Sequence, residues 1–531
     1  MEPRSSHDSS STLAPSSDFP SLPESVTHWH LLSPHGVVTT DILNSKYDGS
    51  GTESDPYIIS FLKNDPGDPK QLPAWRKWII VATVSIVTFI AALGSSIYLG
   101  ILQQTEEQFR VSEEVAILGL SLFILGFVAG PLFFAPCGEL AGRQVTLIGS
   151  FVGYTVFNAA TIASQNIQTL LVLRFLAGFF AACSFTNSTG TLADIFEPAQ
   201  RGMAFGFYAA TPFMGPILGP AIGGFLGTAA GWRWVLGLLT ILSGLGLVLS
   251  ALLVPETYGA ELLNRRAKKM SKLTGKHYVS RLSVGKEPTS VLATFKKDLS
   301  RPWAILFLDP IVLCLSTWVS IVYGTLYLFL AGYPFVYQEA RGWSPGIGGL
   351  ALLGIGGGVL VASAVNIPVS KQFGAKAKKD SAPPEVRLQP AMVGGLFIPM
   401  GIFWFAWTNA PSIPWPSSVI AGSFFGFGMV IVWTSVNNYL TDAYKIYAAS
   451  ALAGQVVMRS IFGAVFPLFT GYMFRRIGLH WAASVPGFIA LACAPLPFIF
   501  YRFGRQIRAR SKYASKADAD TAALHEQKGS A

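Results

Sequence analysis

Two arginines, Arg174 and Arg459, lie inside long apolar stretches of this 531-residue chain. A charged side chain at such a position is unfavourable by several kcal/mol unless it faces a polar cavity or a partner group. The alternative is that the long side chain reaches a membrane surface. Arg174 lies near one end of its stretch, whereas Arg459 lies deeper. We therefore treat both as candidate functional residues.

A second set of charges follows the second apolar stretch. Glu139 and Arg143, with Gly142 between them, are four residues apart, so in a helical turn their side chains face each other. Asp194 ends a later stretch on the same predicted side of the membrane. These residues can form an acidic–basic–acidic contact. The alternative is that they only fix the topology of the chain.

A glycine and proline pattern predicts a close contact between helices. Glycines recur every four residues on one helical face, and two prolines in the same stretch each remove a backbone donor and bend the helix. The pattern consists of Gly215, Pro216, Gly219, Pro220, Gly223 and Gly224.

Polar and aromatic side chains within the apolar stretches are candidates for binding a small organic molecule. They are Asn187, Tyr323, Tyr327, Trp433, Asn437, Asn438 and Gln455. Buried amides need partners, so these side chains could instead bond neighbouring helices. No Asp or Glu lies in the middle of a stretch, and Asp309, at the start of the seventh stretch, is our first candidate for binding a proton.

Twelve apolar stretches must position these residues. A helix that crosses about 30 Å of hydrocarbon needs about 20 apolar residues. The predicted spans are 78–99, 114–136, 145–164, 168–190, 202–225, 233–254, 309–334, 345–369, 389–409, 417–440, 449–473 and 479–501. The fold class is therefore an all-α integral membrane protein with twelve transmembrane helices.

The distribution of the basic residues indicates how the chain is oriented in the membrane. The chain has 39 Lys plus Arg residues and a net charge of +10, and 32 of these basic residues fall on one predicted side against 5 on the other. This is the positive-inside pattern, with both termini cytoplasmic and anionic lipid as a possible contact. We expect no nucleic-acid partner. The 4 cysteines show no metal-type spacing, and no phosphate-binding glycine loop is present, so we expect no metal, no cofactor and no enzyme activity.

The chain divides into two pseudo-symmetric six-helix bundles. Four residues of the first half, Gly178, Asp194, Gly206 and Gly215, match Gly426, Asp442, Gly454 and Gly463 at a constant offset of 248. We predict a disordered cytoplasmic tail over 1–75, bundles over 76–254 and 309–501, a cytoplasmic linker over 255–308 and a tail over 502–531. Apolar residues at helical spacing within 291–299 predict a short surface helix; a solvated linker is the alternative.

Three segments of the first half resemble motifs A, B and C of the major facilitator superfamily. They are residues 138–143, 174–178 and 215–224; in motif A the usual second basic residue is replaced by Gln144. Further segments make the chain similar to the fungal twelve-span drug:proton antiporter group over about 47–510. These segments are 47–57, 323–327, 403–408, 438–444 and 466–469.

The resemblance implies roles for several residues. Arg174 is implied in proton coupling. The set of Glu139, Arg143 and Asp194 is implied to contact the start of span 11, near 448–450, and so to latch an outward-facing state. Motif C is associated with antiporters; the alternative for it is packing without control of direction.

The resemblance also implies a function. It indicates a monomer in the plasma membrane that exports organic compounds, xenobiotics or a fungal secondary metabolite, and exchanges them for protons. The alternatives are an importer or uncoupled facilitator, a polyamine exporter, and a non-transporting sensor. Polyamines would call for buried carboxylates, so their lack favours a neutral, amphipathic or weakly anionic substrate.

Overall fold

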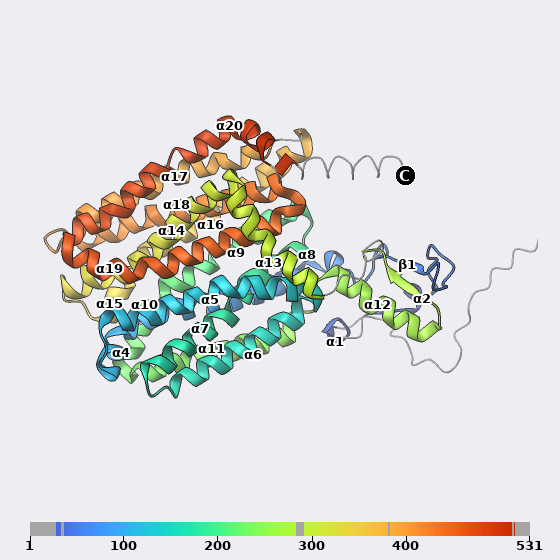
Figure 1. Ribbon diagram of the computed structural model, residues 1–531, viewed down its shortest axis with the longest axis horizontal. Helices are drawn as coiled ribbons and strands as arrows, with labels where there is room; N and C mark the ends of the chain where they lie inside the picture. Colours follow the sequence, from blue (N-terminus) through green and yellow to red (C-terminus); the bar gives the residue numbers. More distant parts are fainter. Residues whose placement is uncertain (1–27, 33–36, 283–290, 381–382, 512–513, 516–531) are drawn as a thin grey trace, which may run out of the picture.

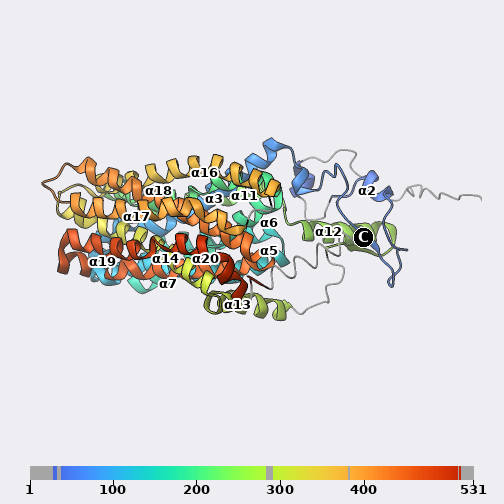
Figure 2. The ribbon, with the colours of Figure 1, turned by 90° about the horizontal axis from the view of Figure 1, so that it is seen from above.

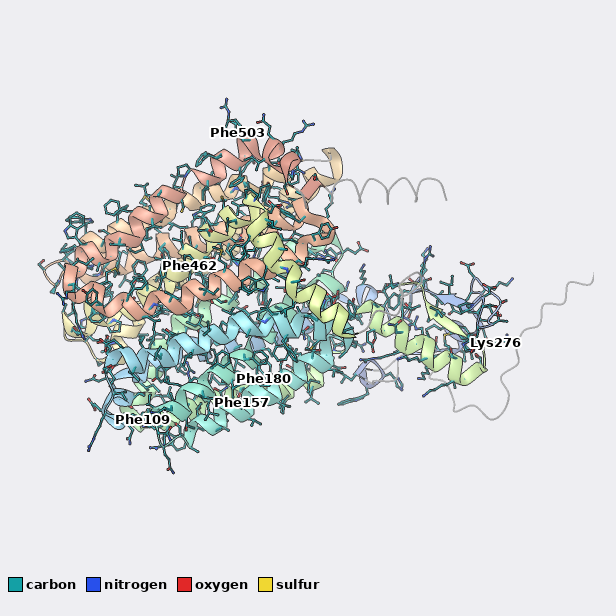
Figure 3. The ribbon with its side chains drawn as sticks, viewed as in Figure 1. Phe109, Phe157, Phe180, Lys276, Phe462 and Phe503 are labelled. Atoms are coloured by element: carbon teal, nitrogen blue, oxygen red, sulfur yellow. The ribbon has the colours of Figure 1, made fainter. Side chains whose placement is uncertain are left out.

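The computed structural model shows two helical halves lying side by side and a small unit that projects from one end of them (Figures 1 and 2). We call the end from which α12 (Gly259–Thr274) projects the linker end, and the opposite end the far end. In Figure 3, Phe109 lies at the far end and Lys276 at the tip of the small unit. The structure describes residues 28–32, 37–282, 291–380, 383–511 and 514–515.

The first half is built from six membrane-spanning segments. They are α3 (Ala74–Ser96) with η2 (Ile97–Ile101) and α4 (Leu102–Phe109), α5 (Glu113–Leu140), α6 (Arg143–Ile162), α7 (Ile167–Ala181) with α8 (Cys183–Ile195), α9 (Pro198–Tyr208) with α10 (Thr211–Ala230), and α11 (Trp232–Leu253). Aromatic packing ties neighbouring helices together, as where the rings of Phe157 and Phe180 stack 5.4 Å apart (Figure 3).

The second half repeats this arrangement. It contains α14 (Pro310–Tyr333) with η3 (Pro334–Glu339), α15 (Pro345–Leu350) with α16 (Leu353–Asp380), η4 (Pro384–Leu388) with α17 (Gln389–Thr408), α18 (Trp415–Tyr444), η5 (Lys445–Tyr447), α19 (Ala448–Cys493) and α20 (Leu496–Arg510).

Eleven helices among the described residues are long and apolar enough to cross a membrane. The last of them, Ala448–Ala509, is broken at Gly478, where φ is 79° and ψ is 166°. A left-handed φ of this kind suits glycine, and the chain reverses direction there (Figure 1). This helix therefore supplies both spans 11 and 12, so the twelve predicted spans are accounted for.

Close helix contacts occur at equivalent places in the two halves. A Cβ atom on Gly178 would collide with the backbone of Phe123 on α5, and one on Gly426 would collide with the backbone of Ile355 on α16. Both glycines thus let the fourth helix of a half approach the second.

Two ion pairs repeat in the same way. Arg143 Nε lies 3.3 Å from Asp194 Oδ2, and Arg387 Nε lies 2.7 Å from Asp442 Oδ2. In each half the arginine lies next to the start of the third helix and the aspartate at the end of the fourth. Together with the glycine contacts, these pairs support the repeat that the offset of 248 predicts.

The small unit combines the N-terminal segment with the middle of the chain. Strand β1 (Tyr57–Ile59) pairs in parallel with β2 (Tyr278–Ser280). Helices α2 (Thr40–Asn44) and α12 pack with this pair, while α1 (His28–Leu32) and η1 (Pro69–Gln71) belong to the same N-terminal segment and η1 contacts α8 of the bundle. Its apolar core consists of Val38, Ile42, Ile59, Ala267 and Met270.

A buried ion pair fixes this unit. The guanidinium of Arg266 on α12 holds both oxygens of Asp65, with Nη1–Oδ2 at 2.5 Å and Nη2–Oδ1 at 2.9 Å, and its Nε donates to the carbonyl of Val37 at 3.1 Å. Both side chains are almost completely buried. A bidentate pair of this kind combines charge with fixed geometry.

The expected disordered tail over 1–75 is therefore corrected for residues 37–73, which fold against α12. Sequence patterns missed this because the partner segments lie about two hundred residues away along the chain. The surface helix expected within 291–299 lies inside α13 (Val291–Leu308). Residues 1–27, 283–290 and 516–531 of the predicted tails and linker lie outside the described residues.

We predict that Arg266→Ala releases the N-terminal segment from α12. Removing one partner of a buried pair leaves Asp65 uncompensated, a loss of about 3–5 kcal/mol. Trypsin should then cut the purified protein after Lys46 or Lys63 at least about tenfold faster, as followed by mass spectrometry. Lys268→Ala, an exposed position on the same helix, is the matched control and should leave the cleavage rate unchanged. Equal rates in the two variants would contradict the role given to the pair.

Candidate functional site

A cluster of charges gathers at the linker end where α6 begins. Gly142 precedes the helix with a φ of 94°, a conformation that favours glycine. A Cβ there would also collide with the carboxylate of Glu256. Gly142 therefore serves both the turn and the approach of this carboxylate.

Glu256 caps helix α6 from a distant part of the chain. Its Oε1 accepts from the backbone N–H of Arg143 at 2.9 Å, and its Oε2 accepts from that of Gln144 at 3.3 Å. It also accepts from its own neighbours Thr257 and Tyr258, each at 2.9 Å. A carboxylate on the free N–H groups of a helix start is favoured by hydrogen bonding and by the helix dipole. Glu256 is only 4% exposed, so these bonds are shielded from water.

Arg143 lies at the centre of the cluster. Besides its ion pair with Asp194, its guanidinium lies 5.2 Å from the centre of the Tyr258 ring. Burial raises the pKa of the Tyr258 hydroxyl, and the nearby Glu139 carboxylate adds to that shift. Gly190 lies so close beneath the guanidinium that a Cβ there would be 2.7 Å from its central carbon. The structure thus joins Arg143 to Asp194, as the sequence predicts.

One predicted residue of this region has another role than expected. Asn187, a candidate for substrate binding, instead donates from Nδ2 to the Arg143 carbonyl at 2.7 Å and is buried within the cluster. Glu139 is exposed at the end of α5. The predicted contact of the latch with 448–450 stays a prediction.

Sequence reasoning missed Glu256, Tyr258 and Arg265. Arg265 on α12 donates to the Ala141 carbonyl at 3.1 Å and lies 3.8 Å from Glu256. All three follow the last apolar residue of span 6, so the sequence predicts them as part of the linker over 255–308. The available signal was an acidic residue directly at the end of a span, on the same predicted side as Arg143.

Arg174 occupies a separate buried site between α3, α5 and α7. It is 0% exposed and donates to the carbonyls of Gly119 at 3.0 Å, Gly94 at 2.9 Å and Ser95 at 3.4 Å. The rings of Tyr98 and Phe123 flank it. The alternative that this side chain reaches a membrane surface is therefore wrong. Its role in proton coupling stays a prediction.

The glycine face of α10 packs on the first span. A Cβ on Gly215 would lie 2.6 Å from Leu93 N, and one on Gly219 would lie 2.7 Å from Ile97 N. Gly223 approaches Ile97 in the same way. Pro216 and Pro220 lie inside this helix. The close contact expected from the pattern is present, whereas control of transport direction stays a prediction.

The two halves touch at both ends. At the far end, a Cβ on Gly224 would lie 2.6 Å from Gly346 N of α15, and Arg475 pairs with Glu113 at 2.6 Å. Near the linker end, Gly206 of α9 packs on α16. Side chains between these contacts lie at the interface of the halves.

Four of the predicted binding residues meet Arg459, a coupling candidate, at this interface. The Arg459 guanidinium lies 5.0 Å from the centre of the Tyr323 ring and 6.0 Å from that of Trp433. The Tyr323 hydroxyl donates to that of Tyr327 at 3.4 Å. Gln455 precedes Arg459 by one helical turn on α19, so both side chains share a face. We call these residues the central cluster.

The remaining candidates have other surroundings, although Asn437 follows Trp433 by one helical turn on α18 and its Oδ1 is buried without a hydrogen-bond partner among the described residues. Asn438 is exposed on α18, and Asn437 is half-buried one residue before it. Asp309 is the N-cap of α14: its Oδ1 accepts from Ile311 N at 3.1 Å, and its Oδ2 accepts a short hydrogen bond from Ser511. The structure thus separates Asp309 from the central cluster and gives it a structural partner.

Comparisons with known proteins agree with this geometry. A family model described as Major Facilitator Superfamily matches residues 84–467. The MFS-type efflux pump MFS2 of Trichophyton rubrum is 51% identical over 501 residues, which cover 94% of this chain and 84% of that protein. The major facilitator superfamily multidrug transporter mdrA of Aspergillus fumigatus is 48% identical over 509 residues, covering 96% and 84%.

A more distant relative and a solved structure extend the comparison. The citrinin biosynthesis cluster MFS transporter mrr1 of Monascus ruber is 38% identical over 485 residues, covering 90% of this chain and 97% of that protein. The proton:xylose symporter XylE bound to 6-bromo-6-deoxy-D-glucose has a TM-score of 0.59 at 14% identity, covering 81% of this chain and 96% of that one. At this identity the likeness shows the fold alone.

We predict that Arg143→Ala and Glu256→Ala each slow transport strongly while the protein stays in the membrane. The reason is that Asp194 loses its cation in one variant and the start of α6 loses its cap in the other. A coupling of about 1–3 kcal/mol would shift a two-state equilibrium by about 5- to 150-fold. Since both residues act in one cluster, the double variant should be little worse than either single variant in proteoliposome flux.

Further variants sharpen this test. Arg143→Lys should retain part of the rate because it keeps the charge but loses the planar fork, and Asp194→Asn should behave like Arg143→Ala. Arg201 is no neutral control, since it donates to the Ala193 carbonyl at 2.8 Å at the end of α8. The exposed Arg281 is the better control. Wild-type flux in Arg143→Ala would show that this residue only sets topology.

Proposed function

This chain belongs to the major facilitator superfamily, and we propose that it exports xenobiotics or a fungal secondary metabolite in exchange for protons. Relatives that share about half of its residues are named an efflux pump and a multidrug transporter. Another is named as the transporter of a citrinin biosynthesis cluster. These names support export of small organic compounds.

The observation that carries the proposal is the position of the central cluster. Trp433 of α18 packs on Phe213 of α10 with ring centres 5.4 Å apart, and Tyr327 of α14 shares a 2.8 Å hydrogen bond with Ser95 of α3. Each contact joins the two halves. In alternating access, the halves rock about a site near the midplane, so residues here are covered and uncovered during transport.

Proton exchange needs a group that changes its charge. The guanidinium groups of Arg174 and Arg459 are hydrogen-bond donors only, whereas a carboxyl group can take up and release a proton. Among the three coupling candidates, only Asp309 has a carboxylate, and its Oδ2 partner, Ser511, comes from the C-terminal segment. We therefore keep Asp309 as the proposed proton carrier.

We propose a plasma-membrane location with both termini cytoplasmic. Arg143, Arg265 and Arg387 all lie at the linker end, which agrees with the positive-inside rule if this end is cytoplasmic. The pairing of β1 with β2 supports a topology in which residues 57–59 and 278–280 lie on the same side of the membrane. An even number of spans between them, six here, fulfils that requirement.

We predict that cells lacking the protein accumulate more of its substrate, and that energised inside-out vesicles take it up. A panel of labelled xenobiotics and fungal metabolites identifies the substrate, and a protonophore should abolish its uptake. Uptake that does not depend on the pH gradient would favour a facilitator, and movement of substrate into cells would favour an importer. Transport of polyamines alone would indicate a polyamine exporter. No flux of any compound would indicate a sensor.

The same vesicles test the proton carrier. Asp309→Asn should keep substrate exchange but lose its dependence on the pH gradient. Asparagine is as good an N-cap as aspartate, so α14 should still form. Asp68→Asn, an N-cap outside the bundle, is the matched control and should stay coupled. If transport by Asp309→Asn still depends fully on the pH gradient, another group must carry the proton.

We predict that tags at residue 275 and at the C-terminus are reached by antibody only after cells are permeabilised. Gly275 follows α12 at the linker end, on the proposed cytoplasmic side. A tag at Ser412, exposed between α17 and α18, should instead be reached in intact cells. A reversed result at any of the three positions would overturn the proposed topology.

A further inference from the structure

Arg459 is a buried cation with open hydrogen-bond donors. It is 5% exposed, and its Nε and Nη1 form no hydrogen bond with any residue that the structure describes. Gln455, one turn earlier on the same face of α19, is 1% exposed, and its Nε2 also has no acceptor within that part of the chain. Three N–H-bearing atoms thus point from one helix face without a partner.

The two other arginines that are almost fully buried among the described residues have hydrogen-bond partners. Arg174 donates to three carbonyls. Arg266 holds a carboxylate through two bonds. A buried hydrogen-bond donor without an acceptor destabilises the folded protein, and a charged donor does so more strongly. The donors of Arg459, which lack acceptors while those of Arg174 and Arg266 have them, are therefore available to bind a ligand.

The charge of Arg459 also has no counterpart. No Asp or Glu among the residues with described positions forms an ion pair with it, although such pairs hold Arg143, Arg387 and Arg508. The central cluster therefore carries a net positive charge in an apolar environment. An anionic ligand would neutralise this charge and accept the unused hydrogen bonds.

The walls of the site are aromatic and come from both sides of the interface. Tyr323 and Trp433 face the guanidinium directly. Tyr323 connects through Tyr327 to Ser95 of the first half, and Trp433 packs on Phe213 of that half. A ligand held by Arg459 would thus lie between flat rings and touch both halves.

We propose that Arg459 and Gln455 bind the carboxylate of an amphipathic aromatic acid, whose apolar body packs on Tyr323 and Trp433. A guanidinium matches the two oxygens of a carboxylate through paired N–H donors, and the amide of Gln455 adds a third. The proposal rests on the proposed function, because it names the substrate class of that exporter.

Matched pairs of ligands test the charge without changing the protein. The pairs are 2-naphthoate with 2-naphthamide and indole-3-acetate with indole-3-acetamide, which keep the ring and differ in the charged group. Isothermal titration calorimetry on the purified full chain should show the acid of at least one pair binding about tenfold or more tightly than its amide. Amides that bind as tightly as the acids, or no binding of any acid, would overturn the proposal.

Variants then assign the preference to the residue. Arg459→Gln should abolish the preference for the acid, and Arg459→Lys should retain a smaller one because it keeps the charge. The control is Arg476→Gln, which removes an exposed arginine from the same long helix α19 and should change nothing. A preference that survives in a folded Arg459→Gln protein would place the anion elsewhere.

Flux in proteoliposomes separates this proposal from the proposed function. If neutral compounds are exported by wild type and by Arg459→Gln alike and acids are not preferred, the exporter stands and the substrate class is wrong. If no compound of the panel moves in either protein, the exporter itself is wrong.

Discussion

The structure depends on one constraint: inside a membrane, each charged or polar group must find its partner within the protein, since no water is there to supply one. Arg174 meets this constraint with three backbone carbonyls from two other helices. Its position therefore fixes the spacing of α3, α5 and α7. Arg459, by contrast, is a nearly buried cation with two donor atoms that have no acceptor among the described residues, and it lies where the two halves meet.

The linker end shows how the same need joins the bundle to the small unit. Neighbouring arginines on α12 point to different partners. Arg265 reaches the Ala141 carbonyl and Glu256 at the start of α6, whereas Arg266 holds Asp65 of the N-terminal segment. A continuous series of polar contacts thus runs from Asp194 through Arg143 and Glu256 to the small unit. A rotation of α12 would therefore disturb both the contacts at the start of α6 and those of the small unit.

Much of this arrangement could be predicted from the sequence because it follows from local periodicity. The spans and the glycine face of α10 depend on residue types at short spacing. The pairing of Arg143 with Asp194, which are 51 residues apart, follows from their predicted position on the same side of the membrane. The cap at Glu256 could not be predicted in this way, since its partner lies 113 residues away. Asn187 was misplaced because a buried amide looks the same whether it binds a ligand or a backbone carbonyl. The fold of residues 37–73 could not be predicted because this segment is mostly polar and contributes only a few apolar residues to its core.

The pairing between Asp65 and Arg266 has a consequence for how the chain is made. These residues are 201 positions apart, and the six spans of the first half lie between them. At about 5–20 residues per second, the N-terminal segment is synthesised roughly 10–40 s before its partner. It must therefore wait on its own side of the membrane while those helices insert. When α12 emerges, the pair ties the two ends of the first half together, so that half is closed into a loop before the second half has been made.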